Sequence, residues 1–180
     1  LPGDPDTVFS DMDACREPIR MLLELAEEFS AKFQEAKEEK NLVDFNDLEH
    51  FALEVLTGGS LDHKPGLVAD ELSEVYEEIL VDEYQDSNQV QNCIFRALSG
   101  EERRLFAVGD VKQSIYRFRL ADPTIFLEKY LSYRPAAEAE EGQPRKVLLS
   151  RNFRSRREVL DGTNFVFRAI MSRGMGEVDY

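Results

Sequence analysis

The sequence predicts an α/β protein in which many helices flank a parallel sheet. Three short apolar runs, each typical of a buried parallel strand, occur at 79–81, 105–108 and 147–149. Amphipathic stretches with helical spacing follow these runs, so strands and helices alternate along the chain. The carboxyl ends of parallel strands meet at one edge of a sheet, where ligands bind. We therefore expect the polar residues after the three runs to form a site.

Composition favours a globular protein that stays in the cytoplasm. The chain has 180 residues, of which 42% are hydrophobic and 32% are charged. No window approaches the roughly 18 consecutive apolar residues that a membrane span needs, and the first residues lack the apolar core of a secretory signal. Cys15 and Cys93 are too few for a disulfide framework, which favours a reducing, cytoplasmic environment.

Charge is distributed unevenly along the chain. The net charge is −14, which argues against a generally basic nucleic-acid-binding protein. Residues 1–102 hold 7 basic and 26 acidic residues, whereas residues 103–180 hold 15 basic and 10 acidic residues. The second part of the chain is therefore where we expect partners that carry phosphate.

Helix signals come from apolar spacing and from residues that cap helix ends. The spacing predicts a long helix from about Pro18, after an opening segment without clear periodicity. Helix starts are expected after Asp44, after Ser87 or Asn88, after Asp122 and after Ser155. A further short helix is expected at 68–76, and a loop at 136–144.

Two adjacent acids follow the first apolar run. Asp82 and Glu83 stand directly after Val81, at the expected tip of a strand. One carboxylate there can hold Mg²⁺, which prefers oxygen ligands and keeps several waters. The other can orient an attacking water or accept its proton. The alternative is a solvated acidic turn.

The second run leads into a segment that mixes glycine, amide, aromatic and basic residues. Gly109 allows a close approach of the backbone, and Gln113 offers a donor and an acceptor for a terminal phosphate. Tyr116 and Phe118 alternate with Arg117 and Arg119, a combination that holds single-stranded nucleic acid by stacking and charge neutralisation. The alternative is that both aromatic side chains belong to the core.

The third run is followed by the basic segment 152–157. Arg154 stands just before an expected helix, where a guanidinium can stabilise charge on a phosphoryl group during its transfer. Three cations in a first helical turn are unfavourable for the helix dipole, which indicates an anionic partner. A solvated basic helix start is the alternative.

Together, the three segments resemble motifs of a known family. VDEYQD, VGDVKQSIYRFR and NFRSR resemble motifs II, III and IV of the UvrD/PcrA/Rep-type superfamily 1 DNA helicases, and LVDFNDLEHFALEVL resembles their aspartate–phenylalanine motif. VGDVKQSIYRFRLADP and NFRSRREVLDGTNFVF are most similar to the AddA (RexA) group, the helicase–nuclease subunits of bacterial double-strand-break processing. The resemblance covers about residues 41–180.

The resemblance implies a role for each matching residue. Asp82 would hold Mg²⁺, Glu83 would activate the hydrolytic water, and Gln113 would contact the γ-phosphate of ATP. Phe153 would stack near the adenine, and Arg154 would reach the γ-phosphate. The residues implied in DNA binding are Asp44, Phe45, Tyr116, Phe118 and Arg119, of which Arg119 would link the stacking residues to the nucleotide cleft.

The resemblance also implies a partial RecA-like motor domain of the P-loop NTPase class. Residues 1–40 would end an inserted 1B-type helical subdomain, 41–150 would form the second part of domain 1A, and 151–180 would open domain 2A. The sequence contains no G-x-x-x-x-G-K-[ST] motif, so the phosphate-loop strand is missing from these residues. We expect an internal fragment that is inactive by itself.

The parent protein implied by the resemblance is one subunit of an ATP-dependent DNA helicase/nuclease. It would couple ATP hydrolysis to translocation on single-stranded DNA in double-strand-break repair and recombination. Its cofactors would be ATP and Mg²⁺, and its partners single-stranded and double-stranded DNA and an AddB-type (RexB) second subunit.

Two alternatives remain at this point. The first is a non-catalytic DNA-binding or scaffold module of a helicase-like complex. The second is a metal nuclease that uses Asp82, Glu83, Asp86 and Asp110, although cleavage requires two metal ions about 3.5–4 Å apart.

Overall fold

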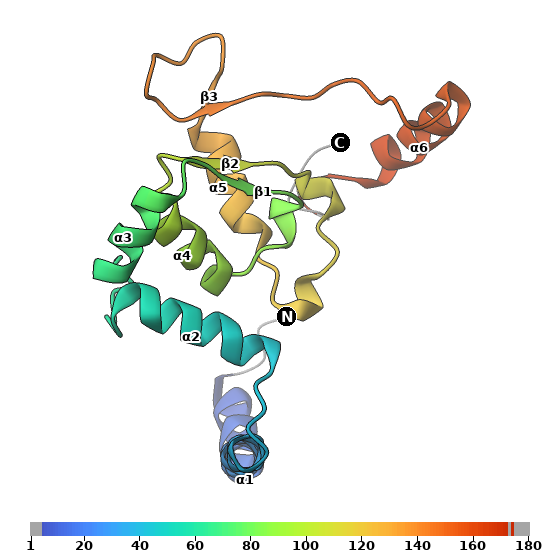
Figure 1. Ribbon diagram of the computed structural model, residues 1–180. Helices are drawn as coiled ribbons and strands as arrows, with labels where there is room; N and C mark the ends of the chain where they lie inside the picture. Colours follow the sequence, from blue (N-terminus) through green and yellow to red (C-terminus); the bar gives the residue numbers. More distant parts are fainter. Residues whose placement is uncertain (1–4, 173, 175–180) are drawn as a thin grey trace. The chain divides into compact units, whose positions relative to one another are not determined.

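The computed structural model describes residues 5–172 and 174 (Figure 1). The chain divides into two compact units, Leu1–Leu48 and Glu49–Tyr180. The domain boundaries expected after residues 40 and 150 stay predictions. Within the described residues, no helix is both long and apolar enough to span a lipid bilayer.

The first unit is dominated by one long helix, α1, which spans Pro5–Glu39. The prediction that this helix starts near Pro18 was wrong, because Pro18 lies inside it. An internal proline removes one backbone donor, which weakens a helix without always ending it. Pro5 stands at the first helical position, where its missing N–H matters little.

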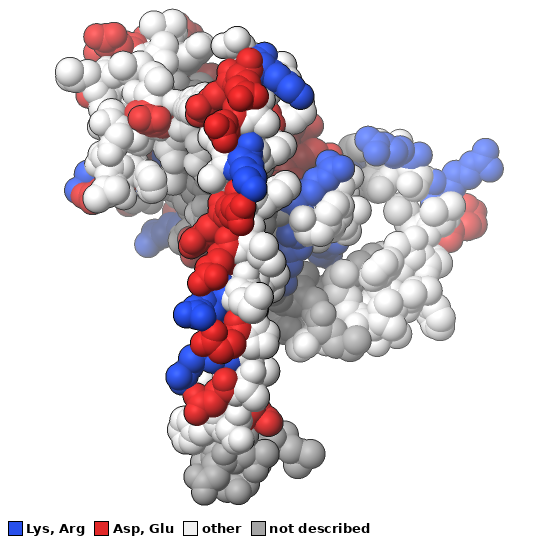
Figure 2. All heavy atoms as spheres, turned by 90° about the horizontal axis from the view of Figure 1, so that it is seen from below, with Lys and Arg blue, Asp and Glu red and all other residues white. Residues whose placement is uncertain are grey.

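The two sides of α1 differ in chemistry. Figure 2 shows the charged side chains along one side of this helix and uncharged side chains along the other. Large apolar side chains are exposed along it, namely Phe9, Met12, Ile19, Leu22, Leu23, Phe29 and Phe33. Periodic apolar spacing of this kind is the signal that predicted a helix here.

Helix α2, Phe45–Thr57, follows a reciprocal cap. The backbone N–H of Asp47 donates to Asp44 Oδ1 at 3.0 Å, and the backbone N–H of Asp44 donates to Asp47 Oδ2 at 2.8 Å. Gly58 and Gly59 end the helix in the left-handed region, with φ of 60° and 74°. The predicted start and end of this helix are confirmed.

The central feature of the second unit is a two-stranded parallel sheet. Strand β1, Ile79–Val81, pairs with β2, Leu105–Ala107, and Leu80 lies opposite Phe106. The side chains of Leu80 and Phe106 are 69% and 62% exposed. Parallel strands are usually covered on both faces, so one face of this sheet is open.

Two helices pack together beside the sheet and carry the main core. Helix α3 spans Leu67–Val75, and α4 spans Gln89–Leu98 between the two strands. Leu56, Ala69 and Ala97 form a buried apolar cluster, against which Leu72, Ile94 and Leu98 pack. Asn88 caps α4 through a capping box with Gln91, so the predicted helix start at Asn88 is confirmed.

The remaining elements follow β2. Helix α5, Pro123–Ser132, begins after Asp122, whose side chain accepts from the backbone N–H of Thr124, as predicted. The three 3₁₀ turns of the unit are η1, Tyr84–Asp86, η2, Val111–Gln113, and η3, Arg117–Arg119. Two-residue strands β3, Arg134–Pro135, and β4, Arg145–Lys146, pair with each other, and α6 spans Arg157–Ile170.

Two predictions near the end of the chain were wrong. Residues 147–149 form no strand, and the side chains of Val147, Leu148 and Leu149 are 69%, 65% and 84% exposed. A strand exists only through bonds to a neighbouring strand, and this segment does not join β1 and β2. Ser155 does not cap α6, because Asn152 Oδ1 accepts its backbone N–H at 2.8 Å and holds it in a turn before the helix.

We predict that Asn88→Ala lowers the free energy of unfolding by about 1 kcal/mol, the usual value of a helix N-cap. The substitution removes the acceptor for the backbone N–H of Gln91, 2.8 Å away. Urea denaturation followed by circular dichroism measures the change. Ser155→Ala is the matched control and should leave the midpoint unchanged; an equal loss in both variants would contradict the observed caps.

Candidate functional site

The ends of β1 and β2 lie side by side. Beyond the paired residues, the backbone N–H of Val108 donates to Val81 O, and that of Tyr84 donates to Val108 O, both at 2.9 Å. The pairing therefore continues until the chain leaves each strand. It brings Asp82 and Glu83 to the same edge as Gly109 and Asp110, as the sequence predicted for parallel strands.

The acidic pair turns sharply away from β1. Glu83 has φ 50° and ψ 40°, a left-handed conformation that is uncommon for a residue with a side chain. The backbone N–H of Glu83 donates to Asp82 Oδ1 at 2.9 Å. Both acidic side chains are exposed. Strained residues of this kind often occur at functional sites, where the surrounding structure holds them.

Tyr84 anchors the turn in the core. Its side chain is fully buried, and its hydroxyl donates to Asn92 Oδ1 at 2.6 Å. The ring packs against Phe95 and Phe126, with centroids 6.2 Å away in each case. Burial, followed by the nearby charge of Glu102, raises the pKa of Tyr84 well above its ordinary value. The phenol therefore stays neutral and remains a hydrogen-bond donor.

Gln85 joins the two strand ends. Its side chain is 1% exposed. Its Nε2 donates to Glu83 Oε2 at 2.7 Å, and its Oε1 accepts from the backbone N–H of Asp110 at 3.0 Å. This residue was not among the predicted site residues. The only signal in the sequence was an amide one residue beyond Tyr84, and no periodic pattern indicated that it is buried.

Asp110 organises the turn that carries Gln113. Its carboxylate accepts from the backbone N–H of Lys112 at 3.1 Å and from Gln113 Nε2 at 3.2 Å. Lys112 Nζ lies 2.9 Å from Asp110 Oδ1. Burial opposes the ionisation of Asp110, but these hydrogen bonds outweigh it, so the pKa of Asp110 lies below its ordinary value.

The aromatic and basic residues after Gln113 form an exposed cluster. The rings of Tyr116 and Phe118 are 5.9 Å apart and tilted by 50°. The guanidinium of Arg119 lies over both rings, 5.5 and 5.6 Å from their centroids. Phe118 is 75% exposed and Tyr116 is 38% exposed. The alternative that both rings belong to the core does not fit this exposure.

Phe153 and Arg154 lie on an exposed segment before α6. Phe153 is 90% exposed. Asn152 Oδ1 accepts from the backbone N–H of Arg154 at 2.9 Å, so the segment forms a local turn. The structure thus connects the first two predicted segments through Gln85, whereas the meeting of Arg154 with Asp82 and Gln113 stays a prediction.

Asp44 and Phe45 belong to the first unit. Lys37 Nζ lies 3.0 Å from Asp44 Oδ2 and 2.7 Å from Asp47 Oδ2. The hydrogen bond to Asp47 raises the pKa of Lys37, and the backbone N–H of Asp47 lowers the pKa of Asp44. Asp44 therefore caps and braces a helix, while Phe45 is 86% exposed. Their role in DNA binding stays a prediction.

The four acids of the nuclease alternative do not gather. Within the described part of the chain, no group of three or more His, Cys, Asp or Glu side chains is placed to hold a metal ion. Asp86 Oδ1 is buried and has no hydrogen-bond partner. Burial, followed by the charge of Glu83, raises the pKa of Asp86. This geometry gives the two-metal reaction no support.

Asp82 fits a different kind of metal site. One of its carboxylate oxygens accepts from Glu83, and the exposed side chain can offer the other to solvent. Mg²⁺ is commonly held by one or two carboxylates together with waters and phosphate oxygens of a substrate. A single carboxylate at a strand tip suits that chemistry.

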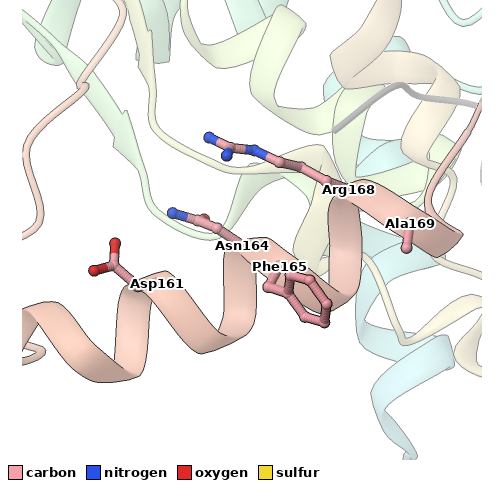
Figure 3. Close-up of a pocket in the computed structure, with 5 residues that line it drawn as sticks. All are labelled: Asp161, Asn164, Phe165, Arg168 and Ala169. Carbon is pink, nitrogen blue, oxygen red and sulfur yellow. The ribbon is translucent and has the colours of Figure 1, made fainter.

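A larger hollow of about 520 Å³ lies along α6 (Figure 3). Its lining consists of Asp161, Asn164, Phe165, Arg168 and Ala169. These residues all come from one helix, and none of them was predicted as a site residue. The hollow is an open surface beside a helix, so the candidate site stays at the ends of β1 and β2.

Comparison with known proteins decides the family. The family model described as the UvrD/REP helicase N-terminal domain matches residues 12–134, which is more than half of the chain. The chain belongs to the UvrD/REP helicase family. The match includes both strand ends and the aromatic cluster, so the helicase motifs II and III expected from the sequence are part of it.

Curated relatives of this UvrD/REP family chain have one name in common, which describes the A subunit of an ATP-dependent helicase/nuclease. The relative from Acetivibrio thermocellus is 51% identical over 96% of this chain. Proteins of the same name from Listeria monocytogenes and Clostridium acetobutylicum are 47% and 52% identical over 95% and 90% of the chain. The chain spans 13–14% of the length of these relatives. The resemblance to the AddA group is confirmed.

We predict that the Asp110 carboxyl of this helicase-family chain titrates below the ordinary aspartate pKa of 3.8. Its contribution to stability is therefore present above that pH and is lost as the pH falls through the lower folded pKa. Carboxyl-carbon NMR measures the midpoint. Lys112→Ala should raise it, while Lys64→Ala, which removes an exposed lysine that pairs with Asp62, should not. A midpoint at or above the ordinary value would show that burial dominates.

Proposed function

We propose that this chain is part of an ATP-dependent DNA helicase/nuclease, in which it helps to couple ATP hydrolysis to movement along single-stranded DNA. One observation carries the proposal: the tip that bears Asp82 and Glu83 is hydrogen-bonded to the tip that bears Gln113. Carboxylates at the first tip suit nucleotide chemistry, and the second tip leads directly into the exposed aromatic cluster. The relatives named as ATP-dependent helicase/nuclease subunits support the same conclusion.

We propose further that the second unit is part of a RecA-like motor domain. Two parallel strands with helices between and after them are the repeating unit of such α/β domains. The exposed face of Leu80 and Phe106 supports this proposal, because the sheet of a complete α/β domain is covered on both faces.

In the nucleotide reaction, Asp82 would hold Mg²⁺, which when bound neutralises the phosphate charges. Glu83 would orient the attacking water and accept its proton, since its exposed carboxylate is fixed through one oxygen. Gln113 would donate to the γ-phosphate. Phe153 would stack on the adenine, and Arg154 would neutralise charge that develops on the transferred phosphoryl group.

On the DNA side, the cluster of Tyr116, Phe118 and Arg119 would hold a single strand. Exposed rings offer faces for base stacking, and the guanidinium over them would neutralise a phosphate. Asp44 and Phe45 would contribute contacts from the first unit. The cluster follows Gln113 by only a few residues, so DNA contact and phosphate contact would be mechanically linked.

The proposal extends to the setting of the whole protein. The relatives are named as one subunit of a helicase/nuclease, which implies a second one, and we propose that this partner is of the AddB type. The substrates would include double-stranded DNA ends, and the work would be double-strand-break repair and recombination in the bacterial cytoplasm.

We predict that Glu83→Gln in the complete protein abolishes DNA-stimulated ATP hydrolysis while ATP still binds. The amide keeps the shape of the side chain but cannot accept the proton of the attacking water. Phosphate release and equilibrium nucleotide binding are the two measurements. Glu54→Gln on α2 is the control. Unchanged hydrolysis in Glu83→Gln would refute the role and favour a non-catalytic DNA-binding module.

We predict that Phe118→Ala weakens the binding of a single-stranded oligonucleotide by about 1–3 kcal/mol, the usual value for one stacked base. Fluorescence anisotropy at fixed salt measures the dissociation constant. Leu61→Ala, which truncates a side chain that is 94% exposed, is the control. Equal affinity in both variants would remove Phe118 from the DNA-binding surface.

A further inference from the structure

Gln85 is buried although it follows two exposed carboxylates in the chain. Its side chain is 1% exposed, and both ends of its amide have a hydrogen-bond partner. A buried amide that lost either partner would carry a large desolvation cost. The two bonds therefore hold the side chain in a single position.

The orientation of the amide follows from its partners. The backbone N–H of Asp110 can only donate, so the amide atom that faces it at 3.0 Å must be the acceptor Oε1. Nε2 then faces Glu83 Oε2 at 2.7 Å. This second bond is charge-assisted, because its acceptor is a carboxylate. The flexible, exposed side chain of Glu83 is thereby tied to the backbone of the neighbouring strand end.

The end of β2 is shaped to receive Gln85. A Cβ on Gly109 would lie 2.5 Å from Gln85 Oε1 and 3.2 Å from its backbone nitrogen. Only glycine leaves the space for this approach. The hydroxyl of Ser114 also donates to Gln85 O at 3.3 Å. Gln85 thus contacts the segment on both sides of Gln113.

We propose that Gln85 is a positioning residue that links the Glu83 carboxylate to the segment carrying Gln113. A shift of residues 109–114 changes the place of the Asp110 N–H, and the rigid amide passes that shift to Glu83. Contact of DNA with the aromatic cluster beyond Ser114 would in this way turn Glu83 toward the attacking water. The inference rests on the proposed function, in which Glu83 and Gln113 act on the nucleotide.

Gln85→Glu in the complete protein tests the link. The introduced carboxylate has the same shape and still accepts the N–H of Asp110, but it can no longer donate to Glu83 and repels it. A misplaced catalytic group costs about 10²-fold in rate, so we expect kcat for ATP to fall by that order. The dissociation constant of ATP should change little. The ratio of kcat with single-stranded DNA to kcat without it should fall toward one.

Gln91→Glu is the matched control. Gln91 Oε1 accepts from the backbone N–H of Asn88, and its Nε2 donates to Glu49 Oε1 at 2.7 Å. The substitution therefore makes the same chemical change, between a backbone N–H and a glutamate, away from the strand ends. It should lower thermal stability but leave kcat and its stimulation by DNA unchanged.

The outcomes separate the proposals. Equal kinetic effects of Gln85→Glu and Gln91→Glu, or normal DNA stimulation in Gln85→Glu, would overturn the positioning role. If Gln85→Glu does not fold, Gln85→Asn replaces it, because its shorter amide can reach only one partner and should show the same loss of DNA stimulation. Full activity of Glu83→Gln would instead overturn the proposed function itself.

Discussion

The pairing of β1 with β2 is the constraint on which the candidate site depends. Two three-residue strands in parallel register bring chain segments that are about 26 positions apart to one edge. The bonds from Val108 to Val81 and from Tyr84 to Val108 extend this pairing to the last residue before each turn. A slip of one residue would turn Leu80 and Phe106 to the opposite face and move Asp82 away from Asp110.

The site combines a rigid base with exposed functional groups. Tyr84 and Gln85 are buried on either side of the turn, one bound to the core and the other to the end of β2. Asp82 and Glu83 stand on this base and remain accessible to water. A left-handed residue such as Glu83 costs free energy, and the fixed neighbours provide the support that keeps it in place.

Electrostatics at the site follow from hydrogen bonding as much as from burial. Asp110 stays ionised because Lys112 and Gln113 donate to it, whereas Asp86 has a buried oxygen without a partner and a raised pKa. Two aspartates in neighbouring turns thus differ in their preferred protonation state. The composition alone, with its excess of acids, gives no indication of this difference.

The sequence by itself determined the local features: the caps at Asp44, Asn88 and Asp122, the two strands, and the helicase motifs that the family match confirms. These depend on contacts between near neighbours in the chain. It did not determine the absence of a strand at 147–149, the helix that continues through Pro18, or the burial of Gln85. Each of these depends on which distant segments meet, and only tertiary structure decides that.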